Sequence, residues 1–251
     1  MLDRFHVPSR EAAGTDINKV IRTEYPDALY AKLACDSREV WRDRNGLFSG
    51  LFHQSGWLIG ASDRSLPFVQ SSIKSAKSLG IEPARPLGME EIRRRWPELN
   101  GDFAGWKSFW SSHAAWVNAQ EGLARMARKA MDGGVKYIVG DKGYVKELLF
   151  DQNSTCIGVK CADGSTYFGS KIILAAGAAS GSLLDLQGQI VANGHTVGHI
   201  QLTAAEVEKY KNMPIIDHLE GGKSFPSRSY PWTLDPHSFQ VYCSLHRKTA
   251  L

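Results

Sequence analysis

The stretch that decides the fold is Met1-Leu2-Asp3-Arg4-Phe5, followed by Gly14-Thr15-Asp16-Ile17-Asn18-Lys19-Val20-Ile21-Arg22. The first five residues are typical of a β-strand that ends in an acid. In dinucleotide-binding folds, an acid at the end of the second strand binds the adenosine ribose, about 20 residues after a glycine-rich phosphate turn. Asp3 fits that acid, whereas the sequence has no G-x-G-x-x-G turn before it. The opening residues therefore predict part of a nucleotide site.

The composition is that of a globular protein with a proper core. The 251 residues are 43% hydrophobic and carry a formal net charge of +4, which suits one large or two small domains. The densest basic run, Arg93-Arg94-Arg95, lies in an expected amphipathic helix, so a solvated face explains it better than nucleic-acid binding. No apolar run reaches the ~18 residues of a membrane span, and the N-terminus has no signal-peptide pattern. We expect an intracellular protein that binds neither nucleic acid nor membranes.

The cysteines and histidines form no disulfide framework and no metal motif. The four cysteines include no C-x-x-C pair, so reduced thiols are expected. His195 and His199 have i, i+4 spacing, but their segment is broken by glycine and favours a strand. We predict no metal site. The cysteines are Cys35, Cys156, Cys161 and Cys243.

Hydrophobic periodicity predicts helices in the first half of the chain. The clearest is 119–132, where Asn118 and Glu121 have capping-box spacing. Its expected inward residues are Leu123, Met126, Ala130 and Met131. The other expected helices are 27–43, with a stripe of Leu29, Leu33, Val40 and Trp41, then 67–79, 88–96, 180–186 and the segment capped by Thr203.

Strand patterns follow from residue 135. Asp163-Gly164 predicts a two-residue hairpin. Lys171–Ala175 is almost wholly apolar, which is typical of a strand buried on both faces of a sheet. Beyond Gly222 no period is sustained, so we predict no regular structure there. The expected strands are 135–139, 144–150, 155–161, 165–169, 171–175 and 199–203.

Several blocks of sequence resemble the flavin-dependent amine oxidases of the D-amino-acid oxidase superfamily. Within it, the chain is most similar to the fungal fructosyl amino acid oxidase, saccharopine oxidase and sarcosine oxidase group. The block Gly14–Arg22 is the most specific part of the likeness, which extends from residue 2 to about residue 216. The matching blocks are Leu2–Phe5 with Val7–Ser9, Ala13–Arg22, Leu51–Trp57, Ile172–Ala178, and His199–Thr203 followed by Tyr210–Pro214.

The resemblance implies an α/β protein with an incomplete FAD-binding Rossmann-like domain and an α+β substrate domain. The FAD-binding domain would comprise residues 1–50 and 116–188. The substrate domain would comprise residues 51–115 and 189–222, and residues 223–251 would form an irregular tail.

FAD is the cofactor that the resemblance implies. Asp3 would accept hydrogen bonds from the ribose hydroxyls, Val145 would meet the adenine edge, and Gly177 would let the backbone approach the cofactor closely. Each residue also has a structural alternative. Asp3 could be an ordinary surface acid, Val145 an ordinary strand residue, and Gly177 part of a simple strand-to-helix turn. The further cofactor-binding candidates are Arg4, Gly14, Thr15 and Ala176.

By the same resemblance, Lys19 and Arg22 are the catalytic candidates. Lys19 would lie over the flavin near N5, where a cation favours electron transfer to oxygen, and Arg22 would bind the substrate carboxylate. The implied reaction oxidises the C–N bond of a secondary amine to an imine, with hydrogen peroxide as the second product. Without the resemblance, a solvated basic turn explains both residues. Candidate pocket residues are Trp57, Trp106 and Trp110, with plain core packing as the alternative.

Two family features are not found in the sequence: the phosphate turn and the C-terminal portion with the cysteine that bonds to flavin. Cys243 lacks the surrounding motif of that cysteine. We therefore expect a fragment from a truncated gene, an alternative start or a mis-spliced message. Three alternatives remain open: an FAD-dependent oxidase, a non-catalytic remnant that does not retain flavin, and a nicotinamide-dependent dehydrogenase. The last leaves Gly14–Arg22 unexplained.

The resemblance implies a small amine and O2 as the substrates. It also implies that the protein is a monomer. Relatives in this family are often peroxisomal, but the chain ends in Thr249-Ala250-Leu251 rather than in a peroxisomal tripeptide. A cytoplasmic or peroxisomal location is expected.

Overall fold

The computed structural model describes residues 1–101, 103, 105–190, 192, 196–219, 232–235 and 238–243. Mixed helices and sheets confirm the predicted α/β class. The chain divides into two compact units. Unit 1 comprises Met1–Ile17 and Ala119–Ala192, and unit 2 comprises Asn18–Asn118 and Asn193–Leu251.

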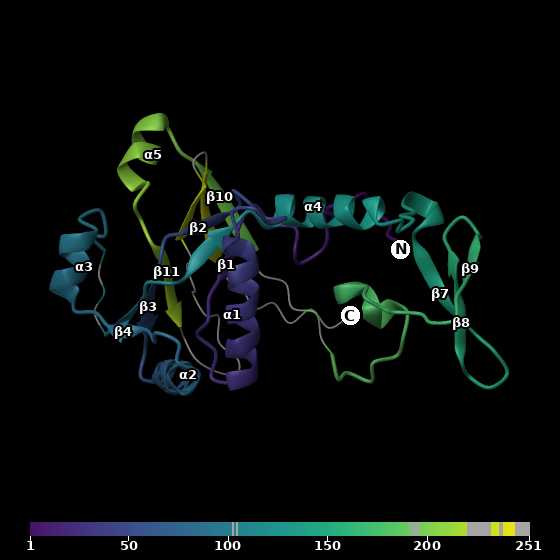
Figure 1. The fold of residues 1–251 in the computed structure, drawn as a ribbon, viewed down its shortest axis with the longest axis horizontal. Coiled ribbons are helices and arrows are strands. Elements are labelled where there is room, and N and C mark those ends of the chain that lie inside the picture. Colours follow the sequence, from purple (N-terminus) through teal and green to yellow (C-terminus); the bar gives the residue numbers. More distant parts are fainter. Residues whose placement is uncertain are drawn as a thin grey trace. The chain divides into compact units, whose positions relative to one another are not determined.

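In its described residues, unit 1 contains one long helix, α4 (Ala119–Asp132), and one antiparallel sheet in the order β7-β8-β9 (Figure 1). The predicted hairpin at Asp163-Gly164 is confirmed, because it joins β8 to β9 and Gly164 has φ +86°. The strands are β7 (Val145–Phe150), β8 (Cys156–Cys161) and β9 (Thr166–Phe168), and the 3-10 helices are η1 (Gly140–Lys142) and η2 (Gly177–Ser182).

Two predicted strands of unit 1 are wrong. Residues 135–139 contribute a single parallel bridge, between Leu2 and Ile138. Residues 171–175 form no strand, and Ile173 is 88% exposed instead of buried on both faces. A strand forms only where neighbouring backbone accepts and donates its ladder hydrogen bonds. Within the described residues, no second strand lies beside either segment. The helix predicted at 180–186 is instead the 3-10 helix η2.

The predicted inward face of α4 is also wrong in part. Met126 and Met131 are 51% and 45% exposed, whereas the buried residues of the helix are Ala119 and Gly122. The loop before unit 2 covers only the start of the helix, since the Gln120 N–H donates to the Asp16 carbonyl at 3.1 Å. Periodicity predicted the position of the helix correctly, but it did not predict how much of the helix surface is buried by neighbouring residues.

The described residues of unit 2 form three sheets, in the orders β1-β6-β2, β11-β3-β5-β4 and β10-β13-β12. Its helices are α1 (Ala28–Arg42), α2 (Leu66–Ser78), α3 (Met89–Arg95) and α5 (Ala204–Tyr210). Its strands are β1 (Lys19–Ile21), β2 (Phe52–Gln54), β3 (Trp57–Ala61), β4 (Arg85–Pro86), β5 (Lys107–Ser111), β6 (Ala115–Val117), β10 (Thr196–Gln201), β11 (Ile215–Leu219), β12 (Trp232–Asp235) and β13 (Ser238–Cys243).

Local signals placed the helices of unit 2 well. The Asp27 side chain caps α1, and Thr203 with Glu206 forms the predicted capping box of α5. Strands β12 and β13 lie in the stretch 223–251, for which the sequence predicts none, and the rest of that stretch lies outside the described residues. The stripe of α1 is largely exposed: Leu29 is 64%, Leu33 53% and Val40 56% exposed.

The sheet that contains β3 separates two cores, with α2 packed on one face and α3 on the other (Figure 1). Strand β11 pairs in parallel with β3, so alternate side chains of both strands enter the same core. The Trp57 core contains Trp57, Ile59, Ala61, Val69, Ala84, Ala114, Trp116 and Ile215. The Leu58 core contains Leu58, Leu87, Ile92, Trp96, Met213 and Ile216.

Gly143 gives a direct test of packing in unit 1. A Cβ atom at this glycine would lie 2.2 Å from the Ile138 carbonyl oxygen and 2.4 Å from that of Asp3. Because backbone must move to admit it, Gly143→Ala should lower the free energy of unfolding by about 2–3 kcal/mol. Calorimetric unfolding measures this. Gly181→Ala is the control, since its Cβ would make only an ordinary contact, and equal stability of the two variants would contradict the packing.

Candidate functional site

Asp3 ends a short extended segment of unit 1. Its N–H donates to the Ile138 carbonyl at 3.1 Å, and the Ile138 N–H donates to the Met1 carbonyl at 3.0 Å. The Asp3 carboxylate accepts hydrogen bonds from the Phe5 N–H at 3.0 Å and the Tyr137 hydroxyl at 3.4 Å. Burial and the adjacent Asp3 charge raise the pKa of Tyr137 to about 12. The tyrosine therefore stays protonated and orients the carboxylate.

Arg4 lies in a cluster of charged and aromatic side chains beside Asp3. It forms an ion pair with Glu11, and its Cζ lies 4.9 Å from the ring centroid of Phe5 and 5.6 Å from that of Tyr144. Hydrogen bonding from Lys146, and then from Arg4, lowers the pKa of the Tyr144 hydroxyl. This positively charged edge suits an anionic or aromatic ligand.

Gly14 and Thr15 support the Asp3 segment from the following loop. The Thr15 hydroxyl donates to the Ser9 carbonyl at 2.6 Å, and the Ser9 hydroxyl donates to Asp3 Oδ1 at 3.4 Å. Gly14 packs tightly on α4, because a Cβ there would lie 3.1 Å from Leu123 Cδ1. Thr15 therefore supports the carboxylate through Ser9, whereas Gly14 lets the loop pack closely on α4.

The other predicted cofactor residues divide into two places. Val145 is half-buried at the start of β7, two residues after Gly143, whose backbone packs against Asp3. Ala176 and Gly177 are exposed, and Gly177 has φ +55° with open space where a Cβ would lie. Among the contacts of the described residues, none joins Ala176 or Gly177 to Asp3.

The surroundings of Asp3 fit the adenosine ribose of a dinucleotide. Three donors reach the two Asp3 oxygens, and two of them lie at 3.4 Å, so the carboxylate keeps acceptor capacity for a ribose hydroxyl. The open backbone at Gly177 admits close approach by a ligand. No G-x-G-x-x-G turn for the pyrophosphate occurs in the sequence.

Lys19 and Arg22 belong to unit 2 and differ in their surroundings. Lys19 pairs with Val117 across the β1–β6 ladder, whereas the next residue, Val20, packs against the Trp57 core. Arg22 follows β1, and its guanidinium donates to the Glu24 carbonyl. Alternation along β1 directs Lys19 away from the core that Arg22 approaches.

Aromatic rings surround the Arg22 guanidinium. Its Cζ lies 4.3 Å from the ring centroid of Tyr25, 5.3 Å from Trp57 and 5.8 Å from Phe68. Arg22, Tyr25 and Phe68 are all half-buried, so the guanidinium remains reachable from solvent. A cation held against aromatic faces is well placed to bind a carboxylate bidentately.

The three predicted pocket tryptophans do not lie together. Trp57 is 2% exposed in its own core, on the Arg22 side of the sheet. Trp106 and Trp110 pack on the Leu58 core, where Trp106 lies 4.6 Å from the His218 ring. The pairing register of β3 with β5 separates Trp57 from Trp110, since Trp110 lies opposite Leu58 and not Trp57.

Sequence reasoning missed Asp217, an acid within the apolar run Met213-Pro-Ile-Ile-Asp-His-Leu219. It lies opposite Ile59 in the β11–β3 pairing, so its side chain points to the Trp57 face. The residue keeps some exposed surface, but its Oδ1 atom is buried and has no hydrogen-bond partner among the described residues. Burial raises the pKa of Asp217 to about 6, and Arg22 partly offsets that rise.

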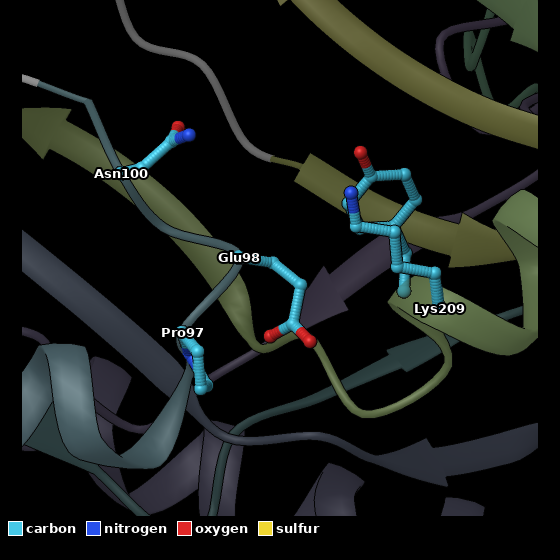
Figure 2. Close-up of a pocket in the computed structure, with 5 residues that line it drawn as sticks. Pro97, Glu98, Asn100 and Lys209 are labelled. Atoms are coloured by element: carbon cyan, nitrogen blue, oxygen red, sulfur yellow. The ribbon is translucent and has the colours of Figure 1, made fainter.

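A shallow hollow elsewhere in unit 2 contains none of the predicted site residues. Figure 2 shows Pro97, Glu98 and Asn100 from the segment after α3, with Lys209 from α5. Tyr210 completes the lining, and the volume is about 280 Å³. Lys209 is exposed and Glu98 is half-buried, and neither contacts a predicted site residue in this lining.

No group of three or more His, Cys, Asp or Glu side chains among the described residues could hold a metal ion, and His195 lies outside these residues. None of the helices in this part of the chain is long and apolar enough to cross a membrane.

The mixed helices and sheets define an α/β protein, and Asp3 at the end of its first extended segment has the chemistry expected of an acid in a dinucleotide site. The chain belongs to the family described as DAO, FAD dependent oxidoreductase, which matches residues 1–229. This confirms the resemblance drawn from Gly14–Arg22 and supports FAD as the cofactor.

The chain is also similar to two named oxidases. The chain is 32% identical to the L-saccharopine oxidase of Schizosaccharomyces pombe, over 92% of this chain and 56% of that protein. It is 26% identical to the amino acid oxidase fsqB of Aspergillus fumigatus, over 80% of this chain and 45% of that protein.

Solved structures show the same fold. The deglycating fructosamine oxidase of Aspergillus fumigatus (Amadoriase II), in complex with FSA, matches with a TM-score of 0.80 and 31% identity, over 98% of this chain and 56% of that one. A modified fructosyl peptide oxidase from Aspergillus nidulans matches with a TM-score of 0.81 and 28% identity, over 97% of this chain and 57% of that one. The chain therefore spans about half the length of these relatives.

We expect Asp3→Asn to weaken FAD binding. Loss of a charge-assisted hydrogen bond to the ribose should raise the Kd for FAD about tenfold. Quenching of flavin fluorescence during titration measures this Kd. Asp132→Asn, at the exposed end of α4, is the control. An Asp3→Asn variant with the wild-type Kd would remove Asp3 from the cofactor site.

Asp217→Asn should change how stability depends on pH. Because the native pKa is raised from 3.8 to about 6, the native state binds this proton more tightly than the unfolded state. Ionisation therefore costs the wild type about 2–3 kcal/mol as pH rises from about 4 to 7. The asparagine variant should escape that cost and gain in relative stability over this range.

Tryptophan fluorescence during urea unfolding can follow this effect, since all seven tryptophans belong to unit 2. Asp36→Asn, on the exposed face of α1, is the control. A stability difference between Asp217→Asn and wild type that is the same at both ends of the pH range would contradict the account.

Proposed function

We propose that this chain is the cofactor-binding and amine-binding part of an FAD-dependent oxidase. The reaction converts the C–N bond of a secondary amine to an imine and O2 to hydrogen peroxide. Fructosyl amino acids, saccharopine and sarcosine are the proposed substrate types. The family match over residues 1–229 and the names of the relatives support the class.

The observation that carries the proposal is the Arg22 guanidinium among the rings of Tyr25, Trp57 and Phe68. A carboxylate bound there would exchange water for two parallel N–H donors in a setting of low polarity. The aromatic rings would exclude water from the bound amine. Arg22 would thus orient an amino acid by its carboxylate.

Asp3 and Lys19 supply the remaining roles in the proposal. Asp3 would hold the adenosine ribose, supported by Tyr137 and Ser9. Lys19 would provide fixed positive charge where oxygen becomes negatively charged. Bound FAD would supply the chemistry of taking two electrons from the amine and passing them to oxygen.

A peroxide assay tests the function. The purified chain with added FAD should release hydrogen peroxide when given sarcosine, saccharopine or a fructosyl amino acid, and catalase should abolish the signal. Reactions without amine are the control. No peroxide from any of the three would contradict the proposal and favour the alternative of a remnant that retains no flavin.

A further inference from the structure

Three polar groups meet on the Trp57 face of the sheet without satisfying one another. The indole Nε1 of Trp57 is a buried donor, and Oδ1 of Asp217 is a buried acceptor, and neither has a hydrogen-bond partner among the described residues. Arg22 lies with its Cζ 5.3 Å from the Trp57 ring centroid. Buried polar groups of this kind cost free energy unless a partner is supplied.

The pairing of β3 with β11 places these groups side by side. Trp57 lies opposite Ile215, and Asp217 follows two residues later, so both point to one face. The next residue, His218, contacts Trp106 on the other face, which confirms the alternation. Arg22 is the charged group that acts on Asp217, yet Asp217 Oδ1 accepts no hydrogen bond from it or from any other described residue. A cation and an anion are thus held apart.

The donors and acceptor in this set indicate which kind of ligand could form the missing hydrogen bonds. Arg22 and Trp57 Nε1 can only donate hydrogen bonds, and Asp217 Oδ1, when ionised, can only accept them. A zwitterion, with a carboxylate at one end and an amine nitrogen at the other, matches this order of donors and acceptor. Arg22 and Asp217 each keep some exposed surface, whereas Trp57 Nε1 and Asp217 Oδ1 are buried, so a ligand would meet Arg22 first and need local side-chain movement to reach the other two.

We propose that Asp217 is a specificity-determining residue, whose Oδ1 accepts an N–H from the amine of an amino acid while Arg22 and Trp57 Nε1 donate to its carboxylate. Asp217 thereby selects substrates that carry both groups over simple carboxylates. The inference rests on the proposed function in taking an amino acid as the ligand, whereas its test needs no turnover.

Calorimetric titration of the 251-residue chain with two probes tests this pairing. Sarcosine carries both groups, and methoxyacetate has an ether oxygen in place of the amine. At about pH 8, where Asp217 is ionised, wild type should bind sarcosine about tenfold more tightly than methoxyacetate. Asp217→Asn should abolish that preference, with methoxyacetate bound as well as before or better, because a repelling charge is removed.

Two further variants separate specificity from structure. Trp57→Phe removes the indole donor together with part of a buried ring, so its unfolding is followed in parallel, and in the folded variant both probes should weaken by the same factor. Asp36→Asn, exposed on α1, should leave both affinities unchanged. A wild type without preference for sarcosine, or an Asp217→Asn variant that keeps the preference or weakens both probes equally, overturns the inference.

The outcome is distinguishable from failure of the proposed function. A chain that binds sarcosine selectively but releases no peroxide would retain the amine site and lack the oxidase activity. A chain that releases peroxide with no selectivity through Asp217 would be an oxidase that recognises the amine elsewhere.

Discussion

Lys19→Met should slow reoxidation of the reduced flavin by oxygen about 10²–10³-fold, the usual cost of removing one preorganised electrostatic group. The proposed role of Lys19 is to stabilise negative charge as it develops on oxygen. Reduction of the flavin by the amine develops no such charge and should change far less. Stopped-flow absorbance measures the two half-reactions separately.

Charge, and not side-chain size, should decide the Lys19 result. Lys19→Arg keeps the cation and should retain most of the reoxidation rate. Lys74→Met removes an exposed lysine from α2 and serves as the matched control. Reoxidation at the wild-type rate in Lys19→Met would remove this residue from the oxygen reaction.

Arg22→Lys should raise the KM for an amino acid substrate about 10²-fold, with a smaller change in kcat. Lysine keeps the charge but loses the fork of donors, and a charge-assisted hydrogen bond contributes about 1.5–3 kcal/mol. A secondary amine without a carboxylate should show no such increase, because it has no partner for the guanidinium. Steady-state peroxide assays with both kinds of amine measure this.

Arg42→Lys is the matched control for Arg22→Lys, because Arg42 forms an exposed ion pair with Glu39 on α1. The Arg22 side chain also packs on Tyr25 and Trp57, so unfolding should be followed in parallel. Equal losses for amines with and without a carboxylate would show that Arg22 supports structure and does not bind the substrate.

Local signals allowed most helices to be predicted. The expected helix 27–43 is α1 at Ala28–Arg42, with Asp27 as its cap, and Thr203 with Glu206 starts α5. Caps and periodicity involve residues only a few positions apart, so the sequence displays them directly.

Strands and burial depend on partners distant in sequence, and here prediction failed. Lys171–Ala175 has a strand composition but no ladder partner in the described residues, and Ile173 is exposed. The prediction that Met126 and Met131 are buried failed for the same reason, since periodicity does not show which distant residues would cover a helix face.

Residues of the candidate site could be predicted only where they belong to a recognisable sequence motif. The Gly14–Arg22 block identified the family, which the match over residues 1–229 confirms. Asp217 carries no motif, and its place opposite Ile59 results from a pairing between segments far apart in the chain. A single acid inside an apolar run was the available signal, and the register of β3 with β5 separates Trp57 from Trp110.

The visible spectrum of the purified chain with FAD, recorded without oxygen before and after an amine is added, tests the central claim most directly. We predict a bound-flavin band that survives gel filtration and bleaches when sarcosine, saccharopine or a fructosyl amino acid is added. A chain that elutes without flavin, or a band that none of the three amines bleaches, would contradict the account.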